Sequence, residues 1–387
     1  MAQRVYYFDY AAATPIDRRV LAVMEPYFSE KFYNPSSPYA QAVEVRREYE
    51  SAKQQIARSI GATADELVMT AGATESINLA IGGYGGHKVT TTIDHASVKR
   101  AVSGGSDYTH VQVDERGRVD PEQVRAAIRP DTQLVSIALA NHEIGTIQPV
   151  REIGRIVNDM RQQRKSNGDL TPLVLHCDAS QGFGLLDMHV GRLGIDLLTL
   201  NAAKIYGPKQ VGLLWVRPGV QVTPTLVGGG QESGLRSGTE NVAGVIGFAE
   251  AVRIADKKRH IESKEIGALR DTLELAILAE LPNAVVSGHR KYRLANFCHV
   301  SFPSIDAERL VFMLERDGVM VATGSACAAN SGTRSEVLTG IGLDDETADG
   351  SIRLTLGRDT TKEEVLYAVE RIIVAVRAES QRTGVRV

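Results

Sequence analysis

Short apolar runs alternate with stretches of helical periodicity through the first two thirds of the chain, and this alternation constrains the fold more than any other feature. Several of the runs are almost continuously apolar, as expected for strands that are buried on both faces of a parallel sheet. The runs are Glu66–Thr70, Lys88–Ile93, Leu134–Ala140, Leu173–Asp178, Ile195–Asn201 and Val211–Arg217. The helical stretches between them include Ser76–Ile81, Pro121–Ile128 and Ile153–Lys165. The pattern predicts βαβ units and a doubly wound α/β domain with a mostly parallel sheet flanked by helices.

The pattern changes after about residue 255. A charged helix is expected at Asp256–Leu281, followed by alternating strand-like segments and two further helices. We therefore expect a large domain at residues 15–255 and a smaller α+β domain formed by residues 1–14 and 256–387. The expected strands are Asn296–Phe302 and Ser351–Leu356, and the expected helices are Asp306–Arg316 and Lys362–Ala378.

Composition excludes several classes of protein. The chain has 387 residues, a net charge of −3 and a pI of about 6.3, which argues against a surface devoted to nucleic acid. No signal peptide or apolar run of the ~18 residues that span a bilayer is evident. Three cysteines without a CxxC pair argue against a disulfide framework or a structural zinc site, and they fit a reducing cytoplasm.

Polar residues follow three of the predicted strands, at the edge where open α/β sheets bind their ligands. They are Asn141, Asp178 and Lys204. A lysine amine and a carboxylate, 26 positions apart and each after a buried strand, favour pyridoxal 5′-phosphate (PLP), which needs an amine for its Schiff base and an acid for its pyridine nitrogen. Taken singly, the aspartate could be a turn residue and the lysine a solvated charge.

A small-residue turn offers a place for the phosphate. Residues 71–76 read AGATES, follow a predicted strand and open a helix. Free N–H groups and the positive end of the helix dipole attract an anion there, and Thr74 adds a hydroxyl. The alternative is ordinary capping of the helix by Thr74.

An ordered set of motifs runs through nearly the whole chain. In order, they are TAGATESINLAI, DHASV, ANHEIGTIQP, LHCDASQG, AAKIYGPK, GGGQESGLRSGTEN, TGSACAA and SIRLTLGR, and they are preceded by YFDYAAATP near the N-terminus and NPSS at residues 34–37. Together these motifs resemble the NifS/IscS group of cysteine desulfurases, which are fold-type I PLP enzymes of the class-V aminotransferase family.

The resemblance implies roles for the residues that hold the cofactor ring. Lys204 is the expected Schiff-base lysine and Asp178 the expected partner of the pyridine nitrogen. His95 matches the histidine that stacks on the ring and shuttles protons. Asn141 and Gln181 match the groups that hydrogen-bond the phenolic oxygen.

It also implies residues for the phosphate and the substrate. Thr74, together with Thr239 of a neighbouring subunit, matches the phosphate ligands, so a homodimer is expected. Arg353, helped by Asn34, matches the group that grips the substrate carboxylate, for which a guanidinium fork is well suited.

Two positions depart from the family pattern. Relatives typically carry Ser-x-His immediately before the lysine, and both side chains contact the phosphate; this chain has Asn201 and Ala203 there. Asn201 can still donate a hydrogen bond, whereas Ala203 cannot. Losing one bond to a charged group weakens binding about tenfold or more, so we expect looser cofactor retention.

Cys327 is the expected sulfur acceptor. It lies among small and polar residues at 323–333, which predicts a loop, whereas Cys177 and Cys298 lie in apolar segments and are expected in the core. A loop thiolate can attack the substrate sulfur and carry the persulfide to a partner.

The expected reaction converts L-cysteine to L-alanine and leaves the sulfur as a persulfide on Cys327 for a sulfur-acceptor protein. Lys204 releases the cofactor to the substrate and removes the α-proton. Iron–sulfur cluster assembly, tRNA thiolation and thio-cofactor synthesis all remain open as destinations of the sulfur. A selenocysteine lyase and a non-catalytic sulfur-transfer scaffold are the alternatives.

Overall fold

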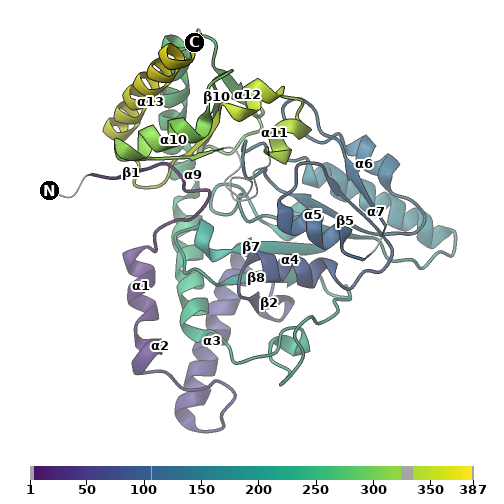
Figure 1. Ribbon diagram of the computed structural model, residues 1–387. Coiled ribbons are helices and arrows are strands. Elements are labelled where there is room, and N and C mark those ends of the chain that lie inside the picture. The colour runs from purple at the N-terminus through teal and green to yellow at the C-terminus, as the bar shows by residue number, and fades with distance from the viewer. Residues whose placement is uncertain (1–3, 106, 324–333, 386–387) are drawn as a thin grey trace.

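A seven-stranded sheet forms the centre of the larger part of the molecule (Figure 1). The structure is a computed structural model that describes residues 4–105, 107–323 and 334–385. The strand order is β2-β8-β7-β6-β5-β3-β4; β8 runs antiparallel to both of its neighbours and the other pairs are parallel. A mostly parallel sheet is thus confirmed. The strands are β2 (Leu67–Thr70), β3 (His87–Thr91), β4 (Tyr108–Val111), β5 (Thr132–Ala138), β6 (Val174–Asp178), β7 (Leu197–Asn201) and β8 (Gly212–Val216).

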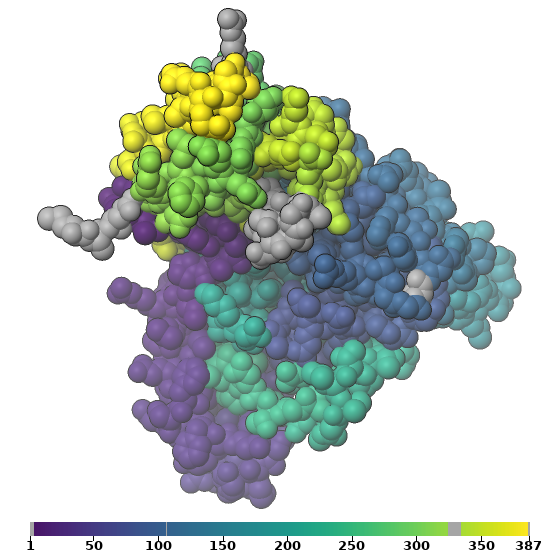
Figure 2. All heavy atoms as spheres, in the orientation of Figure 1, coloured from purple at the N-terminus to yellow at the C-terminus, as the bar shows by residue number. Residues whose placement is uncertain are grey.

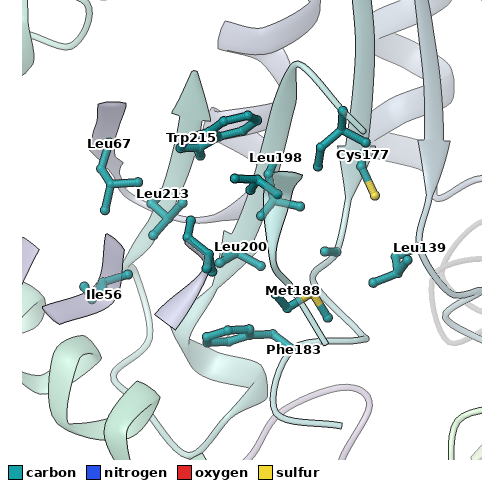
Figure 3. Packing of buried hydrophobic residues seen from close by; sticks show 14 of the residues in the cluster. Ile56, Leu67, Leu139, Cys177, Phe183, Met188, Leu198, Leu200, Leu213 and Trp215 are labelled. Atoms are coloured by element: carbon teal, nitrogen blue, oxygen red, sulfur yellow. The ribbon is translucent and has the colours of Figure 1, made fainter. Parts of the chain in front are cut away.

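The central strands β5, β6 and β7 are largely apolar and almost wholly buried because helices cover both faces of the sheet. In β7, Leu198 and Leu200 pack into the core on one face, while Leu197 joins the core on the other. Figure 3 shows the first of these cores, where Leu198 and Leu200 lie beside Leu213 and Trp215 of β8. The continuous runs in the sequence therefore reflect burial on two sides.

The helices divide between the two faces. Residues of α4 (Ala73–Ile81) and α5 (Ala96–Ser103) belong to the smaller core, and residues of α3 (Ala40–Ser59), α6 (Pro121–Ala127) and α7 (Val150–Ser166) belong to the larger one. Shorter elements of this part are α1 (Arg18–Met24), α2 (Pro26–Ser29), α8 (Val190–Leu193) and the 3-10 turns η1 (Ala64–Glu66), η2 (Ala202–Lys204) and η3 (Glu232–Gly234).

A second core lies beside a four-stranded antiparallel sheet of order β12-β13-β10-β9 (Figure 1). Its strands are β9 (Val285–Ser287), β10 (Phe297–Ser301), β12 (Ala322–Thr323) and β13 (Ser351–Thr355). The N-terminal strand β1 (Tyr6–Tyr7) pairs in parallel with β11 (Val319–Met320), so the N-terminal segment belongs to this part of the molecule. Its helices are α10 (Ala307–Arg316), α11 (Glu336–Gly340), α12 (Asp345–Asp349) and α13 (Lys362–Thr383).

One long helix, α9 (Val242–Glu280), contributes to the larger core of the seven-stranded sheet and to the core beside the four-stranded sheet. The prediction that it begins at Asp256 was wrong: it begins at Val242, where the Asn241 side chain caps it by accepting from Gly244 N at 3.0 Å. Its first two turns, Val242–Ala249, are apolar on every side because they are buried, so the amphipathic period that would have revealed the start of the helix is missing. The predicted domain boundary at residue 255 falls inside this helix, and the two-domain division stays a prediction.

No helix among the described residues is long and apolar enough to cross a membrane. Within the same residues, no three His, Cys, Asp or Glu side chains come together in a group that could hold a metal ion.

Candidate active site

Asp178 is the last residue of β6, at the carboxyl edge of the parallel strands, and is 8% exposed. Ser180 donates two hydrogen bonds to its Oδ1, from the backbone N at 3.0 Å and from Oγ at 2.5 Å. Two residues earlier, the His176 ring contacts Ser136 Oγ at 2.8 Å and Thr199 Oγ1 at 3.0 Å. Burial lowers the pKa of His176 to about 4, although Asp178 opposes the shift. The side chains of Ser136, His176 and Thr199, which lie on β5, β6 and β7 and are joined by these hydrogen bonds, are therefore uncharged at neutral pH.

Lys204 lies in η2, directly after β7, and its amine points to the N-terminal segment. Nζ donates to the carbonyl oxygens of Ala11 and Ala12, each at 2.6 Å. Gln181 Nε2 donates to the same Ala11 oxygen at 3.1 Å. Gln181 and Lys204 thus contact the N-terminal segment at Ala11 and Ala12, although these residues are far apart in the sequence. The contribution of these backbone carbonyl groups to the site was not predicted.

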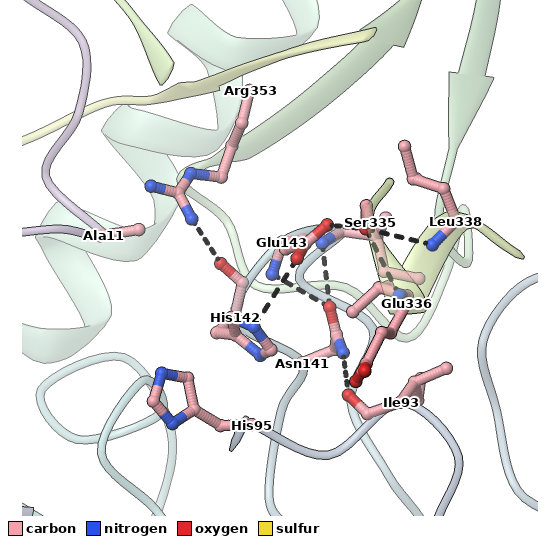
Figure 4. A network of polar contacts seen from close by, with 12 residues as sticks. Ala11, Ile93, His95, Asn141, His142, Glu143, Ser335, Glu336, Leu338 and Arg353 are labelled. Carbon is pink, nitrogen blue, oxygen red and sulfur yellow. Dashed lines mark hydrogen bonds and ion pairs between the residues drawn. The ribbon is translucent and has the colours of Figure 1, made fainter. Parts of the chain in front are cut away.

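His95 follows β3 and caps α5, where its Nδ1 accepts a hydrogen bond from Ser97 N at 3.1 Å. Burial lowers the pKa of His95, with Lys204 adding to the shift and Asp178 opposing it. The ring is thus neutral near pH 7, and because Nδ1 accepts, its proton is on Nε2. The ring of His142 crosses it edge to face with centroids 4.8 Å apart (Figure 4).

Asn141 organises the turn that carries His142. Its Oδ1 accepts from the backbone N of Glu143 at 2.9 Å and of Ile144 at 3.0 Å, and its Nδ2 donates to Ile93 O at 2.9 Å (Figure 4). One amide hydrogen remains for a ligand. The role of Asn141 toward the cofactor oxygen stays a prediction, and the observed role is to tie the turn to the end of β3.

Glu143 is a buried acid that sequence reasoning missed. Ser335, the cap of α11, donates to its Oε2, and His142 Nε2 lies 3.6 Å from its Oε1 (Figure 4). Burial raises the pKa of Glu143 to about 7, and burial lowers the pKa of His142 well below its usual value. No pattern in the sequence marked Glu143 as a site residue, because its hydrogen-bond partner Ser335 is 192 positions away.

Arg353 lies in β13 with its guanidinium held by two other segments. Nη1 donates to His142 O at 2.9 Å, and Nη2 pairs with Asp9 Oδ1 at 2.6 Å (Figure 4 shows the first contact). Its Nε is buried and has no hydrogen-bond partner among the described residues. Asp9 was not predicted; it lies in the YFDYAAATP motif, and a buried arginine would have signalled the need for such a partner.

The turn at residues 71–76 has the form of an anion site. The cap of α4 is Gly72, which has φ 139° and supplies no side-chain hydrogen bond, so the first N–H groups of the helix stay open. Thr74 is exposed at the second position of the helix and is not its cap. The alternative of capping by Thr74 is therefore wrong, and Ala71 N is satisfied instead by Glu75 Oε2 at 2.7 Å.

Asn201 and Ala203 are the two residues that replace the Ser and His of the family pattern, just before Lys204. Asn201 Oδ1 accepts from Ala203 N at 3.1 Å and caps η2, which leaves its amide nitrogen as the group that could donate. The Ala203 carbonyl accepts from Thr14 N and from Thr14 Oγ1, at 3.2 and 3.0 Å. Thr14 thus packs where the lysine turn begins.

Three predicted residues are not brought to this centre within the described chain. Thr239 is exposed and borders a cavity of about 170 Å³ that Ala71 also lines. Asn34 is exposed in the connection between α2 and α3. Cys327 lies outside the described residues, whereas Cys177 and Cys298 are buried as predicted.

Comparison with known proteins gives a consistent set of similarities. Residues 6–367 match the family described as Aminotransferase class-V. The chain is 39% identical to "Cysteine desulfurase IscS" of Dictyoglomus turgidum over 98% of its own length and 97% of that protein, and 40% identical to "Cysteine desulfurase IscS 1" of Archaeoglobus fulgidus over 93% and 94%. A solved "NIFS-LIKE PROTEIN" superposes with a TM-score of 0.88 at 34% identity, covering 97% of this chain and all of that one.

Proposed function

The chain belongs to the class-V aminotransferase family, and from this premise we propose that it is a PLP-dependent cysteine desulfurase that converts L-cysteine to L-alanine. One observation carries the proposal beyond similarity: an amine on Lys204, a carboxylate on Asp178 and a neutral imidazole on His95 gather at the carboxyl edge of a single sheet. This is the donor set that PLP requires.

The residues present fit the cofactor. Both hydrogen bonds recorded for the Asp178 side chain end on Oδ1, so Oδ2 is left for a protonated ring nitrogen. The open N-terminus of α4, with Thr74 beside it, suits the phosphate. When bound, PLP supplies a carbonyl for the amine and a conjugated ring that withdraws electrons from the substrate α-carbon.

The side chains then divide the work on the substrate. Lys204 Nζ would take the α-proton of the substrate. His95 presents Nε2–H and holds a proton close to the reacting atoms. Arg353 binds the substrate carboxylate through Nε and through the N–H groups of Nη1 and Nη2 that do not bond His142 O or Asp9. Because those two contacts already orient the guanidinium, little further ordering is needed when the substrate binds.

Cys327 accepts the sulfur. Its thiolate forms the S–S bond to the substrate sulfur while the substrate Cβ–S bond breaks, and a proton completes the methyl group of alanine. The products are alanine and a Cys327 persulfide, so atoms and electrons balance without an added oxidant. A thiol in a segment rich in small and polar residues suits this transfer, because the persulfide must afterwards reach another protein.

Finer parts of the proposal rest on the sequence. We place the enzyme in the cytoplasm as a homodimer in which Thr239 of one subunit completes the phosphate site of the other, with Asn34 assisting Arg353. A sulfur-acceptor protein of iron–sulfur cluster assembly or of tRNA thiolation is the proposed partner. The three cysteines of the sequence, which form no CxxC pair, support the cytoplasmic assignment.

The decisive experiment incubates the purified protein with L-cysteine and measures alanine, lysine-bound PLP absorbance and added sulfur on each cysteine peptide by mass spectrometry. The wild type should release alanine and carry sulfur on Cys327. Lys204→Ala should lose the absorbance and all turnover, and Cys327→Ser should keep the absorbance but lose the persulfide.

Cys177→Ser and Cys298→Ser are the matched controls. Both thiols are fully buried; burial raises the pKa of Cys177 well above its usual value and that of Cys298 to about 12, so neither is a thiolate at neutral pH. Sulfur on either of them, or undiminished alanine release by Cys327→Ser, would overturn the assignment. Turnover of selenocysteine without turnover of cysteine would identify a selenocysteine lyase instead.

A further inference from the structure

The segment that carries Thr239, residues 228–241, has a conformation that its own backbone disfavours. Glu232 and Ser233 are consecutive non-glycine residues with φ of 49° and 57°. L-residues avoid this left-handed region, and two in succession persist only where surrounding contacts impose them. The contacts that impose this turn are therefore informative about its use.

The first anchor is the buried carboxylate of Glu232. Its Oε1 accepts from Tyr49 Oη at 2.5 Å, and its Oε2 accepts from Lys53 Nζ at 3.0 Å and from Met69 N at 2.8 Å. The side chains of Lys53 and Glu232 are only 7% and 5% exposed. Such a pair is costly to leave half complete, so Glu232 fixes the turn firmly on α3 and β2.

The second anchor reaches the anion turn. Arg236 Nε pairs with Glu75 Oε1 at 2.9 Å, and the other Glu75 oxygen accepts from Ala71 N at 2.7 Å. The segment also closes on itself, because Gly238 N donates to Gln231 Oε1 at 3.0 Å. A chain of contacts thus holds the backbone rigid up to the residue before Thr239.

Beyond these anchors the segment faces outward. Thr239 is exposed, and the neighbouring apolar side chains Leu226 and Val227 are 46% and 85% exposed. Figure 2 shows residues near 220–240, in teal and green, on the outer surface. An internally anchored segment with an outward threonine and exposed apolar neighbours suits contact with a second copy of this chain.

We propose that Glu232 and Arg236 are positioning residues for the cofactor phosphate of the neighbouring subunit, because they lock residues 228–241 in the conformation that presents Thr239 across the dimer. The inference rests on the proposed dimer and deepens it. It assigns control of one subunit's cofactor to two ion pairs in the other subunit: Lys53–Glu232, which is buried, and Glu75–Arg236, which is partly exposed.

Mixed dimers test this directly. One subunit carries Lys204→Ala, so that only its partner can retain PLP through a lysine, and two different affinity tags isolate the mixed species. Arg236→Gln is then added either to the Lys204→Ala subunit or to the PLP-holding subunit. Loss of PLP on dialysis is followed by absorbance and by counting borohydride-reduced lysine, which requires no turnover.

Arg236→Gln on the Lys204→Ala subunit should speed PLP loss at least fivefold, although the PLP-holding chain itself is unchanged. The same substitution on the PLP-holding subunit should change the rate less than twofold. Arg253→Gln is the matched control, because its pairing with Glu250 at 2.6 Å is exposed on α9, and it should have no effect in either arrangement. Arg236→Lys should restore most of the retention.

Faster loss only when the substitution shares a chain with Lys204, or equal rates in both arrangements, would refute the inference. Should Arg236→Gln prevent folding, Glu232→Asp gives the same comparison with a smaller change, because the shorter side chain cannot keep all three contacts of the Glu232 carboxylate. Failure of the underlying function looks different: the wild type would then show no lysine-bound PLP at all. Failure of the dimer alone would appear as unchanged PLP retention in Thr239→Ala.

Discussion

At the scale of single residues, Ala203 is where the phosphate site differs most from its relatives' pattern. Ala203→His should restore a donor beside Asn201 and slow PLP loss on dialysis about tenfold, the value expected for one added bond to a charged group. Rates of PLP release from the wild type and the variant provide the measurement. An unchanged or faster release would mean that another residue already completes the site.

Glu143 predicts a pH dependence whose sign follows from its pKa. Between the usual pKa of 4.5 and the folded value of about 7, the folded protein holds a proton that the unfolded chain lacks, so its contribution to stability falls as pH rises through this window. The cost reaches about 3 kcal/mol above pH 7. Glu143→Gln stays neutral, keeps an oxygen for Ser335 and can donate to the neutral His142 ring.

The variant should therefore melt a few degrees above the wild type at pH 8 and at the same temperature at pH 5. Thermal unfolding of the two PLP-free proteins across this range measures the difference. A gap that is constant with pH would show that Glu143 does not titrate in this window.

At the scale of elements, the start of α4 depends on a residue without a side chain. Gly72 has φ 139°, which L-residues rarely adopt, although nothing lies within 4 Å of an added Cβ. Gly72→Ala should strain the turn, misdirect the open N–H groups and weaken PLP binding severalfold. Gly85→Ala is the control, since an added Cβ is equally unobstructed there and the position has an ordinary φ. PLP affinity is measured by titration of both variants. Equal weakening in the two variants would contradict a special role for the conformation of Gly72.

The elements also show how far sequence alone could lead. Six strands of the large sheet were predictable because burial on both faces gives largely apolar runs, and the positions of Asp178 and Lys204 followed from the strand ends. The edge strand β4 was missed, because it is partly exposed and its sequence, YTHV, has no continuous apolar run. The direction of β8 was not predictable, because an apolar strand reads the same either way. Asp9 and Glu143 were missed because each is defined by a partner distant in sequence, and such contacts leave no local pattern.

At the scale of the whole molecule, the proposed two-fold dimer makes a prediction of its own. Sedimentation at micromolar concentration should give twice the 41.9 kDa of one chain. Thr239→Ala should remain a dimer yet lose PLP faster, because the exposed threonine is lent to the partner. A stable monomer with full PLP occupancy and turnover would exclude the arrangement.

The continuity of α9 bears on how such a chain can change in length during evolution. Val245 and Phe248 belong to the larger core of the seven-stranded sheet, whereas Leu273 and Ile277 belong to the core beside the four-stranded sheet. One inserted residue between them would rotate the distal half by about 100° and advance it by about 1.5 Å, so the second pair would turn away from its core. An insertion of about seven residues would nearly restore the rotational phase, but it would displace everything beyond it by about 10 Å. Insertions and deletions should therefore accumulate in the connecting turns, while the register of this helix stays fixed.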